Sequence, residues 1–184
     1  MSQYPVHTIE TAPEKSKPAL QGLQQNFGLI PNLAATMATS PTLLGGFVGA
    51  FVNFNGGTLS GGERQVALLT NAVANRSEWA VAFHSTMALK EGVAAADVQA
   101  IREGRAPSDQ RLAALSSFDR ALIEKRGKVS EQELNAIREA GFSQDQILEV
   151  IAGLAVSTMA NYAGNITNPP LEAPFKPQAW SAKG

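Results

Sequence analysis

The stretch Asn75 to Gly92, N-R-S-E-W-A-V-A-F-H-S-T-M-A-L-K-E-G, decides the fold of this chain. It contains no proline, begins with a serine that can cap a helix and ends at a glycine, so it predicts one helix. The residues that share one face of that helix are Ser77, Ala80, Val81, His84 and Ala88. A histidine on such a face either points into a cavity or is buried against a carbonyl group. His84 is therefore the first candidate functional residue.

Capping and proline signals predict further helices on both sides of this stretch. Alternating patterns of Val, Ile, Thr and Tyr, which strands favour, are missing, so the predicted fold class is all-α. The segment 41–55 is nearly all apolar or glycine, so it is either enclosed by its own chain or covered by another subunit. The predicted helices are 13–26, a short helix from 31, 41–55, 61–75, 77–92, 94–104, 109–127, 130–141 and 144–164.

Composition narrows the possible classes of protein. The 184 residues form a single predicted domain, 1–184, with an extended N-terminal arm (1–12) and a Pro-rich C-terminal arm (166–184). Zero cysteines exclude disulfides and thiol chemistry, and a net charge of −1 without basic runs argues against a nucleic-acid partner. With neither a signal peptide nor an apolar run of spanning length, we expect a cytoplasmic protein with no membrane partner.

The residue pattern bears on three kinds of site. No metal site is predicted, because His7 lies in a terminal arm and no carboxylate cluster accompanies His84. The glycine-rich segment 55–63 lacks the Lys-Ser/Thr ending of a phosphate-binding loop, so a turn is predicted there. Ser77 and His84 would have Cα atoms about 10 Å apart on one helix, which prevents a direct hydrogen bond and leaves only a water-bridged pair open.

Six segments, in this order, resemble one family. They are F-G-L-I-P-N-L, S-P-T-L-L, L-S-G-G-E-R-Q-V-A-L-L, the stretch 75–92 itself, R-L-A-A-L-S-S-F and A-G-F-S-Q-D-Q-I-L-E-V-I. Together they resemble the AhpD-like branch of the carboxymuconolactone decarboxylase family, whose members include alkylhydroperoxidases. The resemblance implies an AhpD-like helical bundle, a homo-oligomer (commonly a trimer or hexamer), no cofactor, and a site beside His84 near subunit contacts.

The peroxidases of that family carry two cysteines at the start of the histidine helix and a relay glutamate twelve residues before the first. Ser77 and Ala80 stand at the cysteine positions here, and Gln65 stands at the glutamate position. Serine and alanine cannot form a thiolate or a disulfide, and a glutamine amide carries no transferable proton near pH 7. Thiol peroxidase activity is therefore not expected. Either a natural lineage without thiols or replacement of the cysteines of a thiol peroxidase would give this sequence.

The thiol-free decarboxylase branch is the closer analogy, through Glu78, Trp79, Ala80 and His84. It implies decarboxylase-like or lyase-like proton transfer by His84 on a small carbonyl or lactone compound, with Glu63 or Glu78 as its partner. A non-catalytic binding or scaffold protein for a small-molecule ligand is the alternative. The residues considered for the pocket lining are Trp79, Asn161 and Tyr162.

Overall fold

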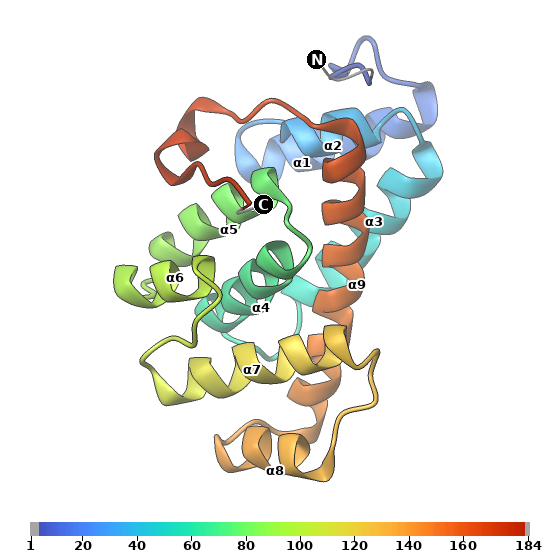
Figure 1. Cartoon of the computed structure of the whole chain (residues 1–184). Helices are drawn as coiled ribbons and strands as arrows, with labels where there is room; N and C mark the ends of the chain where they lie inside the picture. The colour runs from blue at the N-terminus through green and yellow to red at the C-terminus, as the bar shows by residue number, and fades with distance from the viewer. Residues whose placement is uncertain (1–3, 183–184) are drawn as a thin grey trace.

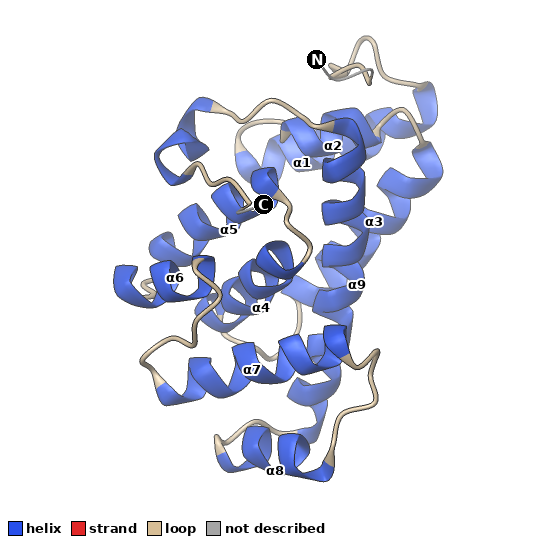
Figure 2. Ribbon diagram, viewed as in Figure 1, coloured by secondary structure: helices blue, strands red, loops and turns tan. Residues whose placement is uncertain are grey.

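The computed structural model describes residues 4–182, and within that range the chain forms helices and loops without a strand (Figures 1 and 2). The all-α prediction is confirmed. The α-helices are α1 (Lys17–Phe27), α2 (Asn32–Met37), α3 (Pro41–Asn55), α4 (Gly61–Ala74), α5 (Glu78–Lys90), α6 (Ala95–Arg102), α7 (Gln110–Glu124), α8 (Glu131–Glu139) and α9 (Gln144–Thr167). Two 3-10 helices, η1 (Glu14–Ser16) and η2 (Ala173–Gln178), lie near the ends of the chain.

Helix α4 is the centre of the bundle. It packs against α5, α6, α7 and α9, and every residue from Val66 to Ala72 is buried (Figure 1). The start of α4 is fixed by a capping box, in which Ser60 N donates to Glu63 Oε2 at 2.8 Å and Glu63 N donates to Ser60 Oγ at 3.3 Å. The capping pattern therefore sets where the buried run begins, and with it the faces that α4 shows to α5 and α9.

Two helix ends differ from the sequence prediction. The first helix was predicted from Pro13, but a 3-10 turn intervenes and α1 begins only at Lys17. Helix α9 passes the predicted stop at Gly164 and ends at Thr167, followed by the C-cap Asn168, whose φ of 43° is left-handed. Gly164 instead serves close packing, because an added Cβ would lie 3.3 Å from Ser77 Oγ. Gly164, which the sequence pattern predicts as a helix end, is instead a close contact between α9 and the start of α5.

The C-terminal segment was predicted as an extended arm from residue 166. Its first two residues belong to α9, its middle forms η2, and its last two residues lie outside the described range, as do residues 1–3 of the N-terminal arm. Phe175 of η2 is buried against α5, and Trp180 Nε1 donates to Arg102 O at 3.2 Å. The segment is thus anchored on its own chain, across α5 and α6 (Figure 1).

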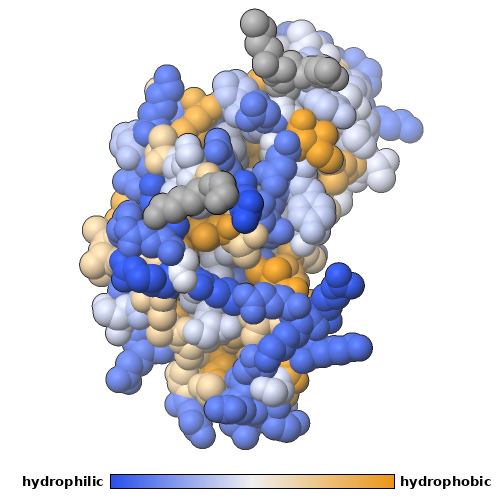
Figure 3. All heavy atoms as spheres, viewed as in Figure 1, coloured by the Kyte–Doolittle hydropathy of each residue, from blue (hydrophilic) through white to orange (hydrophobic). Residues whose placement is uncertain are grey.

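Helix α9 carries an exposed apolar stripe. Leu148, Ile151, Tyr162 and Ile166 are 65%, 48%, 58% and 68% exposed and recur at helical spacing. Apolar side chains also reach the surface on the side where Figure 1 places α9 (Figure 3). By length and composition alone α9 is apolar enough to cross a membrane, and half of its most apolar window is buried inside the protein.

Candidate functional site

His84 lies on α5 and faces a neighbour on α4. Its side chain is buried, and its Nδ1 lies 2.9 Å from Gln65 Oε1. An amide oxygen can only accept a hydrogen bond, so Nδ1 carries the hydrogen and donates it. The other ring nitrogen, Nε2, is then left with its lone pair free to accept. Gln65 therefore fixes the tautomer and the orientation of the imidazole.

Burial decides the charge of this imidazole. Loss of solvent contact lowers the pKa of His84 to about 3, because burial disfavours the charged ring. Its hydrogen-bond partner, Gln65, is neutral and gives an imidazolium no opposite charge. His84 is therefore neutral at pH 7 and presents a hydrogen-bond acceptor.

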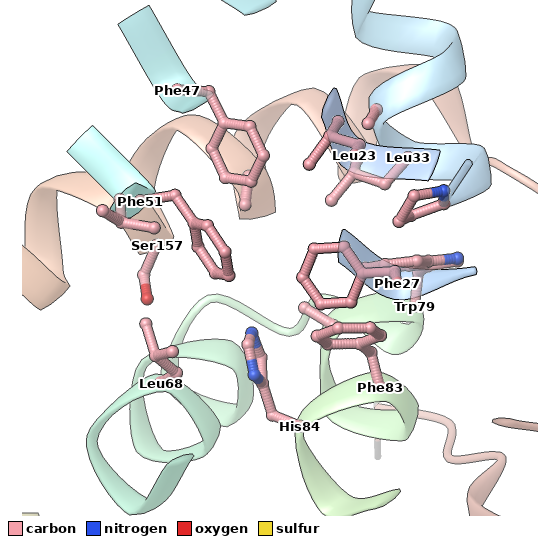
Figure 4. A pocket seen from close by; sticks show the side chains of 15 residues that line it. Leu23, Phe27, Leu33, Phe47, Phe51, Leu68, Trp79, Phe83, His84 and Ser157 are labelled. Atoms are coloured by element: carbon pink, nitrogen blue, oxygen red, sulfur yellow. The ribbon is translucent and has the colours of Figure 1, made fainter. Parts of the chain in front are cut away.

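The Nε2 side of His84 faces a small apolar cavity of about 40 Å³ (Figure 4). The lining residues come from six helices, α1 to α5 and α9, and from Pro31 just before α2. Aromatic rings form much of the wall, and Phe27 lies 5.9 Å from Phe51 and 6.3 Å from Phe83 between ring centroids. The cavity is lined by Leu23, Phe27, Pro31, Leu33, Ala34, Phe47, Phe51, Leu68, Trp79, Ala80, Phe83, His84, Val156, Ser157 and Ala160.

A second polar group, the hydroxyl of Ser157 on α9, lines the same cavity. Ser157 is 2% exposed, and its Oγ is buried without a hydrogen-bond partner among the described residues. In Figure 4 the side chain of Ser157 points toward Leu68, and the ring of His84 rises from α5 beside Leu68 and below Phe51. Sequence reasoning missed Ser157, although it lies one helical turn before Asn161, which was considered for the pocket.

Trp79 forms the wall between the cavity and the C-terminal segment. Its indole stacks on Phe83 at 5.0 Å with 13° between the ring planes, and Phe175 packs edge-on against both rings. Trp79 Nε1 donates to Glu172 Oε2 at 2.8 Å, while Asn32 N donates to Glu172 Oε1 at 2.6 Å. Glu172 therefore ties the cavity wall to the start of α2 and holds the orientation of Trp79.

The three positions that carry redox and relay groups in the family peroxidases are separated here. Gln65 hydrogen-bonds to His84, and Ala80 lines the same cavity as His84. Ser77 precedes the first residue of α5 but its side chain makes no capping hydrogen bond, and it lines a different pocket, of about 730 Å³, at the start of that helix. A Ser77–His84 hydrolytic pair therefore receives no geometric support.

The structure does not bring either predicted carboxylate to His84. Glu63 accepts from Ser60 N and from Arg111 Nε, the latter at 2.6 Å. Burial alone would raise the pKa of Glu63, but these hydrogen bonds outweigh it and the net shift is downward, so the group stays ionised. Glu78 is exposed beside the pocket of Ser77. Neither carboxylate lines the cavity of His84.

The two candidates on α9 also lie outside the cavity lining. Asn161 is buried with its Nδ2 unpartnered, and Tyr162 is 58% exposed and points away from the core. Within residues 4–182 no group of three His, Asp or Glu side chains is placed to hold a metal ion. The polar groups that the structure does assemble at the cavity are His84, held by Gln65, and Ser157.

The chain is similar to known proteins in sequence pattern and in fold. The sequence pattern of the carboxymuconolactone decarboxylase family matches residues 45–122, which include α4 and α5. No curated protein matches. Among solved structures, an AhpD-core, uncharacterized peroxidase-related protein from Ralstonia eutropha JMP134 has a TM-score of 0.83 at 21% identity, over 95% of this chain and 94% of that one.

Two other solved structures are similar in fold. The C82A variant of the debrominase Bmp8, in complex with 2,3,4-tribromopyrrole, has a TM-score of 0.78 at 18% identity, over 97% of each chain. An uncharacterized peroxidase-related protein from Silicibacter sp. TM1040 has a TM-score of 0.77 at 16% identity, over 94% of this chain and 92% of that one. Residues 45–122 therefore match the carboxymuconolactone decarboxylase family, and the chain has the AhpD-like helical fold.

Proposed function

We propose that the protein is a thiol-independent family member that takes a small, largely apolar ring compound into the cavity of His84. The neutral imidazole accepts an O–H or N–H of that compound and, in a reaction, accepts its proton. The observation that carries this proposal is the Nδ1 to Gln65 Oε1 hydrogen bond of 2.9 Å, which leaves the Nε2 lone pair for the cavity. Because no cysteine is present, thiol chemistry is excluded, and the proposed role of His84 is hydrogen bonding and proton transfer.

The lining supports a planar and mostly apolar ligand. Phe27, Phe51 and Phe83 offer ring faces and edges for stacking. The polar side-chain groups of the lining are His84, Ser157 and the indole N–H of Trp79, which is already paired with Glu172. The debrominase Bmp8, similar in fold at 18% identity, was solved as its C82A variant with 2,3,4-tribromopyrrole, a flat ring with one N–H. A compound of that shape suits the cavity of this chain on chemical grounds.

The size of the cavity requires the wall to move when a ring enters. A cavity of about 40 Å³ is well below the roughly 150 Å³ that accommodates benzene in a protein interior. An open groove of about 670 Å³ shares four lining residues with the cavity, namely Leu23, Phe27, Phe51 and Phe83. Phe27 and Phe51 are only half-buried, so their rotation toward the groove is the entry route that this geometry favours.

Binding of 2,3,4-tribromopyrrole tests the proposal. We expect the parent compound to bind about tenfold more tightly than its N-methyl derivative, because only the parent donates a hydrogen bond to Nε2. The variant His84→Phe keeps an aromatic ring without an acceptor and should bind the two compounds equally. Calorimetric titration gives both affinities. Equal binding of the two compounds by the unaltered protein would rule out the proposed role of Nε2.

A non-catalytic binding protein is the second candidate, and the low pKa of His84 favours it, because a base with a pKa of about 3 is weak at pH 7. The same titration sample separates the two candidates. In D2O, a proton-transfer enzyme would accelerate exchange of the single ring C–H hydrogen of the bound pyrrole, and His84→Phe would remove that acceleration. Binding without any exchange above the buffer rate would select the non-catalytic candidate.

We also propose that copies of this chain associate through α9 and the neighbouring α3. The exposed stripe on α9 carries no charged residue, and α3 offers Gly45 and Gly49, where an added Cβ would meet nothing within 4 Å. Soluble monomers rarely leave so continuous an apolar surface uncovered. The family resemblance suggests a trimer or hexamer.

The replacement Ile151→Glu should dissociate this oligomer, because it places a charge in the middle of the apolar stripe. Light scattering after size-exclusion chromatography should show the mass fall to that of one chain, with the helical circular dichroism unchanged. The replacement Gln132→Glu, at an exposed position of α8 away from the stripe, adds the same charge and is the matched control. A monomeric unaltered protein at micromolar concentration would contradict the proposal.

A further inference from the structure

We propose that Ser157 is the second polar contact of the ligand in the cavity of His84, and that its hydroxyl donates to a carbonyl or similar acceptor on that ligand. This inference rests on the proposed function and narrows its ligand class. The compound is a small planar ring with one hydrogen-bond donor and one acceptor on different edges. A hydroxylated aromatic carbonyl compound and an unsaturated lactone with a hydroxyl group both have this pattern.

The hydroxyl of Ser157 is distinguished from other buried or half-buried hydroxyls by its lack of a partner. Thr70 Oγ1 and Ser116 Oγ pair at 2.9 Å, and Thr36 Oγ1 donates to Leu33 O at 2.8 Å. Thr158, the next residue on α9, donates to Leu154 O at 2.8 Å, one turn earlier on the same helix. Ser157 Oγ makes no such bond and is buried. Since buried hydroxyls are nearly always paired in proteins, a partner from outside the chain is expected.

The cavity offers the space for that partner. Ser157 comes from α9 and His84 from α5, and both residues line the same cavity (Figure 4). The two side chains do not hydrogen-bond to each other, so a third group is needed to pair both. His84 Nε2 accepts and Ser157 Oγ–H donates, and the third group must therefore present a donor to one side and an acceptor to the other.

Water alone can occupy the site before a ligand binds. A volume of about 40 Å³ exceeds the roughly 10–15 Å³ that one water molecule needs, and both polar atoms are available to hold water. A ring that carries its own donor and acceptor reproduces those hydrogen bonds when it displaces the water, whereas a ring with a donor only leaves Ser157 unpaired again. Ser157 is therefore a specificity-determining residue, and it selects against ligands without an acceptor.

Three probes and two variants test this inference. Phenol carries only the donor, while 3-hydroxybenzaldehyde and 4-hydroxybenzaldehyde add a carbonyl acceptor at two different distances from it. We expect the isomer whose spacing fits to bind the unaltered protein about tenfold more tightly than phenol. Ser157→Ala should remove that gain and leave the affinity for phenol within about twofold. The matched control is Thr158→Val, which removes a hydroxyl from the adjacent position of α9 without touching the cavity lining.

The outcomes separate this inference from the proposed function. If phenol binds in a manner that depends on His84 but neither aldehyde gains affinity, or if Ser157→Ala weakens all three probes equally, only the role of Ser157 is overturned. If no probe binds to the unaltered protein, or if His84→Phe changes nothing, both proposals fail. Tighter binding of one aldehyde that is lost in Ser157→Ala and kept in Thr158→Val supports the assignment.

Discussion

Replacing Gln65 with glutamate should raise the pKa of His84 by about 1–3 units from its present value of about 3. The glutamine oxygen that now accepts from Nδ1 at 2.9 Å would become a carboxylate oxygen, and its negative charge would favour the imidazolium in a site with little water. The change restores the residue type found at this position in the peroxidases of the family. The substitution therefore tests whether the side chain at position 65 sets the pKa of His84.

Proton NMR can follow this titration directly, because the chain has only two histidines. His7 lies near the N-terminus and is removed by His7→Gln, which identifies the signal of His84. Gln65→Met has a similar length but no acceptor and is the matched control, in which the pKa of His84 should stay low while the fixed Nδ1–H tautomer is lost. A pKa that stays near 3 in Gln65→Glu would show that burial alone governs the ring.

The sequence predicted the helices well because their signals are local. Ser60 with Glu63 and Ser130 with Glu133 form the expected capping boxes, and α4 and α8 begin directly after the two serines. The position of His84 also followed from local spacing and from the resemblance. These features depend on residues within one or two turns of each other, so no knowledge of the packing was needed to find them.

The site itself depends on contacts between distant parts of the chain, and there the sequence was a poorer guide. Glu63 was a candidate partner of His84, but its carboxylate accepts a hydrogen bond from Arg111, which lies 48 residues later in the chain. Glu172 orients Trp79 from 93 residues away. The unpartnered hydroxyl of Ser157 becomes significant only once α9 packs beside the cavity. Such pairings follow from tertiary packing, which periodicity and capping patterns do not encode.

A buried carboxyl group on α7 gives the second large expected effect, on the pH dependence of stability. Asp119 is fully buried, and its Oδ2 accepts from Asn71 Nδ2 at 2.6 Å. Asp119 Oδ1 and Asn71 Oδ1 are both buried without a partner. A proton on Asp119 Oδ1 would satisfy both oxygens at once, because the carboxylic acid and the amide can then form two hydrogen bonds. Burial accordingly raises the pKa of Asp119 to about 8.

The raised pKa fixes the direction of the effect. An aspartate in the unfolded chain has a pKa of about 3.9, so between about pH 4 and pH 8 the folded protein binds one proton more than the unfolded chain. The stability that this extra proton gives the folded state is fully present below about pH 4. It is lost as the pH rises toward 8, by about 1.4 kcal/mol of unfolding free energy for each pH unit. Above about pH 8 Asp119 is ionised in both the folded and the unfolded state, so its effect on the unfolding free energy no longer changes with pH.

Asp119→Asn should abolish this loss, because an amide at position 119 supplies permanently the hydrogen that the carboxyl group holds only below its pKa. Urea unfolding between pH 5 and pH 9 should show the variant more stable than the unaltered protein by a margin that grows by about 1.4 kcal/mol for each unit up to pH 8 and then levels off. Asp109→Asn, at the exposed start of α7, controls for removal of a charge from the same helix. A margin that did not change with pH would mean that Asp119 is ionised in the folded protein throughout this range, and that the two unpartnered oxygens are satisfied by water instead.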